Sequence, residues 1–375
     1  MKRQEMIRLW HTNTTGISKR RVVMSAGAVL LIPLASACGS TSSSPSSQSA
    51  PMPSISVGIP AVSLSEGQIY LAQDLGYFRD AGVNVTITNL NATAITKLAA
   101  GQVDVIAYGA SADLPIIAQR RPAKVLYVNL YGNPVGVMVQ SSAPYKTIED
   151  LAGKKVAVLG TTGSLAGLAR AMSTYLQKKG LQPLQVESVA DASGETALLE
   201  SGQVDAIFGP IDFAPTQIAT DRFRFIYSPA NQVPADIPGT GPVPTTVISA
   251  LSTTIQSKPQ ALARFFAAVA QADKYLASTP PAEVAAVLAK DPAYNGYSKS
   301  TLEDFVKYYA PLYEASKLGL ITPSLWQQAL NTYASYGLGL DMTNAEFSYG
   351  NAVDMAPLNQ GLDLGIKFAS ASGTN

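Results

Sequence analysis

Leu98-Ala-Ala-Gly-Gln-Val-Asp-Val-Ile106 and Leu199-Glu-Ser-Gly-Gln-Val-Asp-Ala-Ile207 repeat one pattern at two places in the chain. Each copy reads as a helix end, a glycine, a polar turn and a hydrophobic strand. Glycine is favoured directly after a helix because it tolerates the left-handed backbone that closes the last turn. Chance agreement of such signals is the alternative explanation, but an identical Gly-Gln-Val-Asp in the same structural place favours two similarly built halves.

Alternating strands and helices surround both copies. The first half predicts strands at 55–59, 83–88, 103–108 and 124–130, and helices at 66–78, 93–100 and 111–120. The second half predicts strands at 155–159, 184–189 and 204–208, and helices at 163–179, 195–201 and 213–220. Strands joined by helices of this length form right-handed crossovers in a mostly parallel sheet. We therefore expect an α/β fold with two lobes.

The last third of the chain predicts helices instead of a third lobe, at 257–276, 280–290, 299–315 and 323–336. We expect the chain to recross through 245–250 and to pack these helices on the first lobe. Their many tyrosines are interpreted as packing faces rather than as a carbohydrate platform. Lobe 1 is therefore expected to hold 54–132 and 247–375, and lobe 2 to hold 133–246. Residues 338–375 are given no role of their own.

Residues 1–37 read as a secretory signal peptide. A polar segment ending in Lys19-Arg20-Arg21 precedes an uncharged, largely apolar run at 22–37. This run is shorter than the about 20 apolar residues of a spanning helix, which argues against a signal anchor that is kept. Whether export uses the general or the twin-arginine route stays open, because the arginine pair is followed by Val22 and not by the usual Phe.

Leu34-Ala-Ser-Ala-Cys38 resembles the lipobox of bacterial lipoproteins, whose cysteine is lipidated and becomes the new N-terminus. The usual Leu three residues before the cysteine is replaced by Ala35. Ordinary cleavage that leaves a free thiol is the alternative, but an exposed lone thiol is unfavourable in a secreted protein. We expect lipidation at Cys38, a Ser/Pro-rich tether over 38–53, and a location on the outer face of the bacterial cytoplasmic membrane.

Composition excludes several classes of function. The only histidine is His11 and the only cysteine is Cys38, so the body of the chain has no His general base, thiol nucleophile, or His or Cys metal ligand. The whole chain carries a net charge of +1 and residues 1–37 carry +5, which leaves −4 for the remainder. Nucleic-acid binding is excluded by this charge. We expect no enzyme activity, no metal and no cofactor.

Four segments resemble the nitrate/sulfonate/taurine-type solute-binding proteins, a superfamily that also holds the Thi5-like binders of thiamine pyrimidine precursors. They are Tyr70-Leu-Ala-Gln-Asp-Leu-Gly-Tyr-Phe-Arg-Asp-Ala-Gly82, the two Leu-x-x-Gly-Gln-Val-Asp segments, and Thr147-Ile-Glu-Asp-Leu-Ala-Gly-Lys-Lys-Val-Ala-Val158. The resemblance covers about 55–338. It implies a type II periplasmic-binding-protein fold, a ligand cleft between two lobes, and an ABC permease with its ATPase as partners. We expect a monomer.

Four turns at the carboxyl ends of predicted strands are candidate ligand contacts, because ligands of open α/β sheets bind there, at helix N-termini. The resemblance likewise implies ligand contacts at two of these turns, 108–111 and 161–164. The candidate side chains are Ser63, Ser65, Glu66, Tyr108, Ser111, Thr161, Thr162, Ser164, Asp212 and Phe213.

Each candidate has a structural alternative. The hydroxyls can be helix caps, the aromatic rings can belong to the core, and Glu66 and Asp212 can complement helix dipoles. If the two carboxylates face the cleft, they favour a ligand with amine or hydrogen-donor character over nitrate or a sulfonate. The absence of Arg and Lys from the four turns points the same way. The ligand class therefore stays open.

The resulting hypothesis is a lipoprotein that binds a small polar organic or anionic solute, of the sulfonate, nitrate or pyrimidine-precursor class, for an ABC importer. Closure of the lobes about crossovers near 131–135 and 245–250 would trap the solute. A ligand-sensing lipoprotein coupled to signalling and a secreted carboxylate-dependent enzyme on the same fold are the alternatives.

Overall fold

The computed structural model describes residues 51–60, 62–90, 93–118, 123–159, 163–189, 192–213, 222–228, 237 and 240–369. The predicted signal peptide, Cys38 and most of the tether lie outside these residues and stay predictions. Thr161, Thr162 and the helix expected at 213–220 also lie outside them, apart from Phe213 itself.

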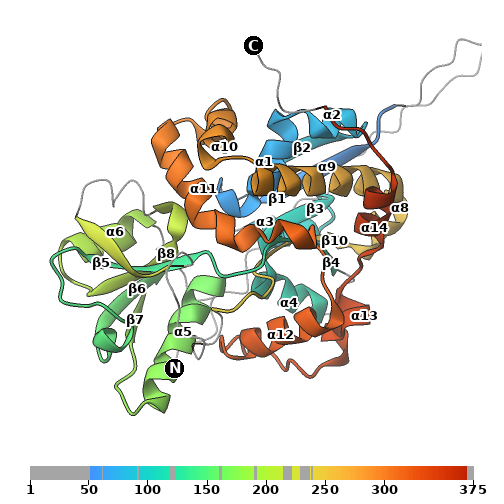
Figure 1. Ribbon diagram of the computed structural model, residues 1–375. Helices are drawn as coiled ribbons and strands as arrows, with labels where there is room; N and C mark the ends of the chain where they lie inside the picture. Colours follow the sequence, from blue (N-terminus) through green and yellow to red (C-terminus); the bar gives the residue numbers. More distant parts are fainter. Residues whose placement is uncertain are drawn as a thin grey trace, which may run out of the picture. The chain divides into compact units, whose positions relative to one another are not determined.

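The first sheet has five strands in the order β2-β1-β3-β10-β4 (Figure 1). Their bounds are Ser54–Ile59 for β1, Asn84–Asn89 for β2, Val105–Gly109 for β3, Ala123–Leu130 for β4 and Thr246–Leu251 for β10. Strand β1 pairs in parallel with β2 and β3, whereas β10 runs antiparallel to β3 and β4. The sheet is therefore mixed: the strand-helix alternation predicts its two parallel pairings, and β10 adds two antiparallel ones.

The second sheet repeats this arrangement in the order β7-β6-β8-β5-β9. Its strands are β5 (Val135–Gln140), β6 (Lys155–Leu159), β7 (Gln185–Val189), β8 (Ala206–Pro210) and β9 (Phe223–Tyr227). The antiparallel strand is β5, which pairs with β8 and β9 and so takes the place that β10 has in the first sheet. Each sheet thus receives its fourth strand from a part of the chain that crosses over from the other half.

These crossing strands correct two expectations. The strands expected in the second half include neither β5 nor β9. Strand-helix alternation does not predict an antiparallel strand such as β5 at the point where the chain changes sheets. The return crossover is also not at 245–250, since Thr246–Leu251 is hydrogen-bonded inside the first sheet. It precedes Thr246, whereas the outgoing crossover lies between Leu130 and Val135, as predicted.

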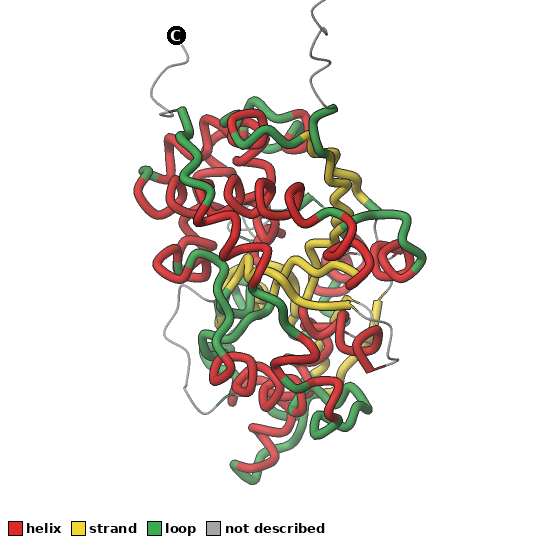
Figure 2. The backbone as a smooth tube through the Cα atoms, turned by 90° about the vertical axis from the view of Figure 1, so that its right-hand side faces the viewer, coloured by secondary structure: helices red, strands yellow, loops and turns green. Residues whose placement is uncertain are grey.

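Helices pack around both sheets, and Figure 2 shows the strands inside and the helices outside. The first half contains α1 (Gly67–Asp74), α2 (Tyr77–Asp80), α3 (Ala94–Ala99) and α4 (Ala110–Ala118), and the second contains α5 (Gly163–Lys178) and α6 (Ala192–Glu200). The single helix expected at 66–78 is in fact three pieces. A 3-10 turn, η1 (Leu64–Glu66), leads into α1, and Gly76 with φ of 75° separates α1 from α2.

The repeated Gly-Gln-Val-Asp occupies the same place in both halves. Gly101 and Gly202 follow α3 and α6 with φ of 68° and 71°, the left-handed conformation that the pattern predicts. The backbone N–H of each following aspartate then bonds a neighbouring strand, Asp104 to Ser56 O at 3.1 Å and Asp205 to Lys155 O at 2.7 Å. The repeat therefore sets the start of one strand in each sheet.

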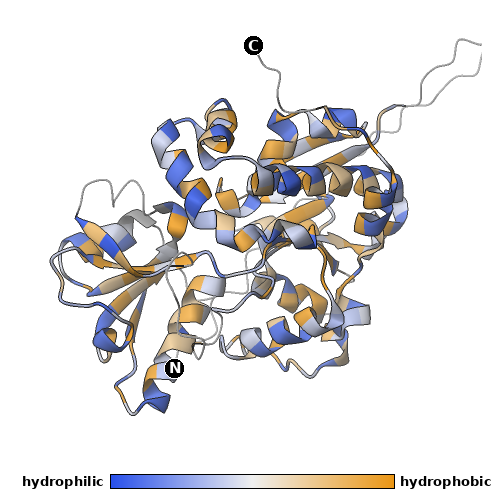
Figure 3. Ribbon diagram, viewed as in Figure 1, coloured by the Kyte–Doolittle hydropathy of each residue, from blue (hydrophilic) through white to orange (hydrophobic). Residues whose placement is uncertain are grey.

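The last third of the chain is helical, as predicted. It contains α8 (Ser252–Ser257), α9 (Pro259–Ser278), α10 (Pro281–Leu288), α11 (Lys299–Tyr313), α12 (Pro323–Ala334), α13 (Tyr349–Ala352) and α14 (Ala356–Asp363). Strands and helix faces inside the first half are hydrophobic in Figure 3. In that core, Phe265 and Phe266 of α9 stack on Phe78 and Tyr127 with ring centroids 5.4 and 5.6 Å apart.

The segment given no role in the sequence interpretation packs on the first half. A Cβ at Gly361 of α14 would lie 2.3 Å from the Ala263 carbonyl oxygen of α9, so only glycine allows this close crossing. The Asp354 N–H bonds Val125 O of β4 at 3.0 Å. Residues 338–369 therefore complete the core of the first half. Among the described residues, no helix is both long and apolar enough to cross a membrane.

Candidate functional site

The carboxyl end of β8 in the second sheet meets the carboxyl end of β1 in the first. A 3-10 turn, η4 (Ile211–Phe213), follows β8, and its Asp212 accepts the Leu64 N–H of η1 at 3.3 Å. Two of the four predicted turns, far apart in sequence, are therefore in direct contact. The structure brings Ser63, Ser65, Glu66 and Asp212 together.

Glu66 and Asp212 form a buried carboxyl pair at this contact. Glu66 is 2% exposed and Asp212 8%. Burial, and then the charge of Asp212, raises the pKa of Glu66 well above its ordinary value. Burial also raises the pKa of Asp212, although the nearby Ser63 and Tyr309 hydroxyls and the Leu64 N–H lower it in part. One oxygen of each carboxyl, Glu66 Oε2 and Asp212 Oδ1, has no hydrogen-bond partner.

Tyrosines from the helical last third cover this pair. The Tyr309 hydroxyl lies 3.4 Å from Ser63 Oγ and 3.3 Å from Ser65 Oγ. Tyr294 donates to Ser63 O at 3.3 Å, and Tyr313 donates to Leu64 O at 2.9 Å. The sequence interpretation assigned these tyrosines to packing alone. Their role at the site depends on η5 (Pro292–Tyr294) and α11 folding back over η1, which no local pattern predicts.

Ser63 also acts as the helix cap that was its structural alternative, because its Oγ accepts the Ser65 N–H at 3.0 Å. Two other candidates, Tyr108 and Ser111, lie at the end of β3 and in the first turn of α4. Burial and the charges of Asp113 and Glu66 raise the pKa of Tyr108. Ser111 is buried.

In the second half, Ser164 lies half-buried in the first turn of α5, and Phe213 ends η4. Glu195, in the first turn of α6, is a residue that the sequence interpretation missed. It is fully buried, and neither carboxyl oxygen has a hydrogen-bond partner. Burial raises its pKa to about 8, although the Phe208 backbone lowers it in part. An acidic residue in a first helical turn looks like an ordinary dipole partner in sequence, which explains why it was missed.

A second contact joins the halves through Tyr336, which follows α12. Asn133 of the outgoing crossover donates to the Tyr336 hydroxyl at 3.1 Å, and Arg170 of α5 donates to its carbonyl at 2.5 Å. The Tyr336 ring packs on Gly167 of α5, where a Cβ would lie 2.5 Å from ring atoms. This contact has no space for a larger residue on α5.

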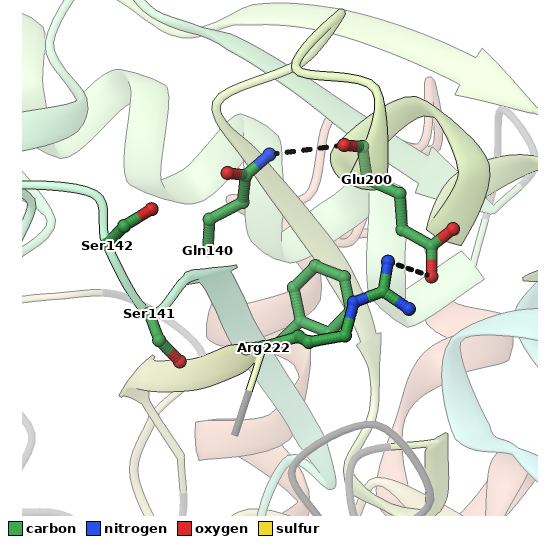
Figure 4. Close-up of a pocket in the computed structure, with 6 residues that line it drawn as sticks. Gln140, Ser141, Ser142, Glu200 and Arg222 are labelled. Carbon is green, nitrogen blue, oxygen red and sulfur yellow. Dashed lines mark hydrogen bonds and ion pairs between the residues drawn. The ribbon is translucent and has the colours of Figure 1, made fainter. Parts of the chain in front are cut away.

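A hollow of about 320 Å³ lies elsewhere, at the edge of the second sheet (Figure 4). Arg222 and Glu200 form an ion pair there at 3.0 Å, and Gln140 Nε2 donates to Leu199 O at 2.6 Å. Because β5 is antiparallel to β8, its last residue, Gln140, lies towards the amino end of β8, away from Asp212. The hollow is open and its charges are paired, so the Glu66–Asp212 contact is the stronger candidate site. Within the described part of the chain, no acidic cluster is arranged to bind a metal.

Solved structures share this architecture. A protein of Bordetella bronchiseptica RB50 is similar with a TM-score of 0.65 and 19% identity, over 83% of this chain and 97% of its own. The alkanesulfonate-binding protein SsuA of Xanthomonas axonopodis pv. citri, bound to MOPS, is similar with a TM-score of 0.58 and 15% identity, over 77% and 95%. The desulfurization enzyme DSZB is similar with a TM-score of 0.55 and 13% identity, over 82% and 98%.

At these identities the likeness establishes the fold, which is that of periplasmic binding proteins, as the sequence resemblance predicts. No curated protein sequence matches the chain. The family described as NMT1/THI5 like matches residues 65–283, which is more than half of the sequence. The chain belongs to the NMT1/THI5-like family.

Proposed function

We propose that this chain is a solute-binding lipoprotein that captures a small polar solute between its two halves and delivers it to an ABC importer. Lipidation of Cys38 would hold it on the outer face of the cytoplasmic membrane, with the Ser/Pro-rich tether as spacer. The observation that carries the proposal is the contact between η1 and η4, since it joins the carboxyl ends of two separate sheets. Ligands of open α/β sheets bind at such ends.

Closure of the two halves is the proposed mechanism. The solute would bind the η1, β3–α4 and η4 turns together and stabilise the arrangement in which these turns meet. The crossovers around Asn133 and before Thr246 would absorb the motion. A permease would recognise the closed form. The structural similarity to an alkanesulfonate-binding protein supports solute binding on this fold. It does not identify the solute of this chain.

A carboxylate-dependent enzyme is the second candidate. The raised pKa values of Glu66 and Asp212 favour it, because perturbed buried carboxyls are common at catalytic sites, and DSZB is an enzyme of similar fold. The absence of any His or Cys in the body of the chain supports the binding protein instead. Turnover of a bound compound by the purified chain, lost on Glu66→Gln, would identify the enzyme.

The test compares solute binding with closure. Thermal shift would first find binders among sulfonates, nitrate, pyrimidines and amines, because a ligand at 100 times its Kd stabilises the folded chain by about 2.7 kcal/mol. X-ray scattering with and without a saturating binder should then show a smaller radius of gyration in its presence. Superimposable scattering curves would contradict closure.

Gly167→Ala provides a structural variant for the same test. The added methyl group meets the Tyr336 ring in the closed arrangement and should cost about 1–3 kcal/mol of closure free energy, which weakens binding by about 5- to 150-fold. Gly241→Ala is the matched control, because a Cβ there meets nothing within 4 Å. Equal affinities of the two variants would contradict a role for this contact in binding.

A further inference from the structure

The carboxyls of Glu66 and Asp212 come from different halves of the molecule, are both buried, and meet where Asp212 accepts the Leu64 N–H of η1. Burial disfavours the charged form of each, and the charge of Asp212 further disfavours that of Glu66. None of the ion pairs between described residues includes either side chain. Two like charges in such a place repel strongly unless a proton or a cation joins them.

Each carboxyl also has an acceptor oxygen that is free. Glu66 Oε2 and Asp212 Oδ1 are buried and accept no hydrogen bond, whereas almost all buried polar atoms in proteins have a partner. One free oxygen belongs to η1 and the other to η4. A single donor group that bound between them would satisfy both and would join the two halves.

Most of the other titratable groups that interact with the pair are phenols. Those whose pKa responds to the charge of Glu66 or Asp212 are Tyr70 of α1, Tyr108 of β3, Tyr294 of η5, and Tyr297, Tyr309 and Tyr313 around α11. Four further carboxyls, Asp74, Asp113, Asp273 and Asp291, act on the same tyrosines, and burial raises the pKa of Asp74 to about 8 and those of Asp113 and Asp273 to about 7. Aromatic rings beside carboxylates are the usual surroundings of a bound ammonium group.

We propose that the solute carries a positively charged nitrogen, which binds between Glu66 and Asp212 and is required for closure. The inference rests on the proposed solute-binding function and names its substrate class. A cation neutralises the repulsion and donates to both free oxygens. An anion placed there would add a third negative charge, so a sulfonate or nitrate group does not fit this position. Any anionic part of the solute would have to bind elsewhere.

The same pair couples binding to motion. Without a cation, closing the halves brings two carboxylates together, so the empty chain favours the open form. A cationic solute removes this cost, and its affinity therefore differs between the open and closed forms, as any ligand that drives closure requires. Protons should replace the cation in part. A protonated carboxyl does not repel the neighbouring carboxylate, and its O–H can donate a hydrogen bond to it.

Matched pairs of compounds test the charge requirement. The probes are putrescine against 1,4-butanediol, taurine against isethionate, and 4-aminobutyrate against 4-hydroxybutyrate, so that each pair differs mainly in an amine or a hydroxyl. Isothermal titration at pH 7.5 should show that the amine member of at least one pair binds at least 100-fold more tightly. Glu66→Gln and Asp212→Asn should each reduce that preference by at least 10-fold. Glu200→Gln, which removes an exposed carboxylate away from the site, should leave it unchanged.

A second measurement needs no ligand. Labels at Ser142→Cys and Ser278→Cys, both exposed, report the distance between the halves in a Cys38→Ser chain. Lowering the pH from 8 to 5 should increase the closed population of the parent. In Glu66→Gln the closed population should already be larger at pH 8 and should change less with pH.

The outcomes separate the two proposals. Hydroxyl compounds that bind as tightly as their amines would overturn the charge requirement and leave solute binding intact. A distance distribution that ignores pH, or responds equally in Glu66→Gln, would overturn the role of the pair even when no probe binds. Failure of every compound, of any charge, to bind would instead contradict the proposed function, and the distance measurement would then decide about the pair alone.

Discussion

Acidic side chains at the two ends of the sheets differ in whether their carboxyl oxygens have hydrogen-bond or ion-pair partners. At the amino ends, Asp104 accepts bonds from the Ser56 N–H and hydroxyl at 2.8 and 2.9 Å and pairs with Lys258 at 2.8 Å. Asp205 accepts the Tyr145 hydroxyl at 2.6 Å and the Lys155 N–H at 3.1 Å. At the carboxyl ends, Glu66, Asp212 and Glu195 each keep at least one buried oxygen without a partner.

The pKa values follow this difference. Burial alone would raise the pKa of Asp104, but the bonds from Lys258 and Ser56 outweigh it and lower the pKa. Burial dominates at Glu66, Asp212 and Glu195, and their pKa values are raised. Asp104 thus stabilises the fold, whereas the carboxyl-end residues cost stability. Such a cost is typical of groups that are held ready for a ligand.

Glu195→Gln should give the largest effect. The folded pKa of about 8 exceeds the ordinary 4.5, so the folded chain keeps a proton that the unfolded chain releases. Wild-type stability should therefore fall as pH rises from about 4.5 to 8, whereas the neutral variant lacks this loss. By pH 8 the variant should be more stable by about 4 kcal/mol, and near pH 4 the two should be equal. Urea unfolding across this pH range measures the difference.

Glu200→Gln is the control for that series, because Glu200 lies in the same helix as Glu195 and is exposed. The Glu200→Gln chain keeps the Glu195 carboxyl, so its stability should fall with rising pH as that of wild type does. A Glu195→Gln chain that followed the wild-type pH curve would mean that Glu195 ionises freely in the folded state, and the contrast between the two sheet ends would lose this example.

Asp104→Asn should destabilise the chain by about 2 kcal/mol at neutral pH, because hydrogen bonds to a charged group contribute about 1.5–3 kcal/mol. The sign of the pH dependence is opposite to that of Glu195. A lowered pKa gives stability that is present above about pH 4 and is lost as pH falls through the folded pKa. Thermal unfolding at pH 7 and pH 3 should show the difference between variant and wild type shrinking in acid; a constant difference would contradict the role of the Asp104 charge.

The fold could be predicted from sequence because its signals are local. A glycine after a helix, followed by a polar turn and a hydrophobic strand, specifies the same geometry at Asp104 and Asp205. The antiparallel strands β5 and β10 could not be predicted, since their neighbours are fixed by long-range pairing and not by the residues between them. The packing of α14 on α9 likewise could not be predicted. It depends on Gly361, and the need for glycine there is evident only from the close approach of Ala263 in the structure.

The site could be predicted only in part for the same reason. Strand-end position predicts Glu66 and Asp212 correctly as residues at a carboxyl-end turn, and the structure brings them together. Their mutual burial depends on the two halves meeting, which no local pattern encodes. Tyr309 and Tyr313 were missed because tyrosines on an amphipathic helix look like packing residues, and Glu195 because burial of a first-turn acid is a tertiary effect.

The smallest expected effect on stability distinguishes Asp205 from Asp104, the aspartates of the two repeat copies. Among the described residues, Asp205 has a phenol and a backbone N–H as partners and forms no ion pair with lysine or arginine, unlike Asp104 with its Lys258. Asp205→Asn should therefore cost about 1 kcal/mol, less than Asp104→Asn, and Tyr145→Phe should cost a similar amount by removing the same bond. The double variant should cost little more than either single one, because the two changes break one shared interaction. Additive losses in urea unfolding would show that Tyr145 and Asp205 contribute independently, and that the second copy stabilises its strand by the backbone bond alone.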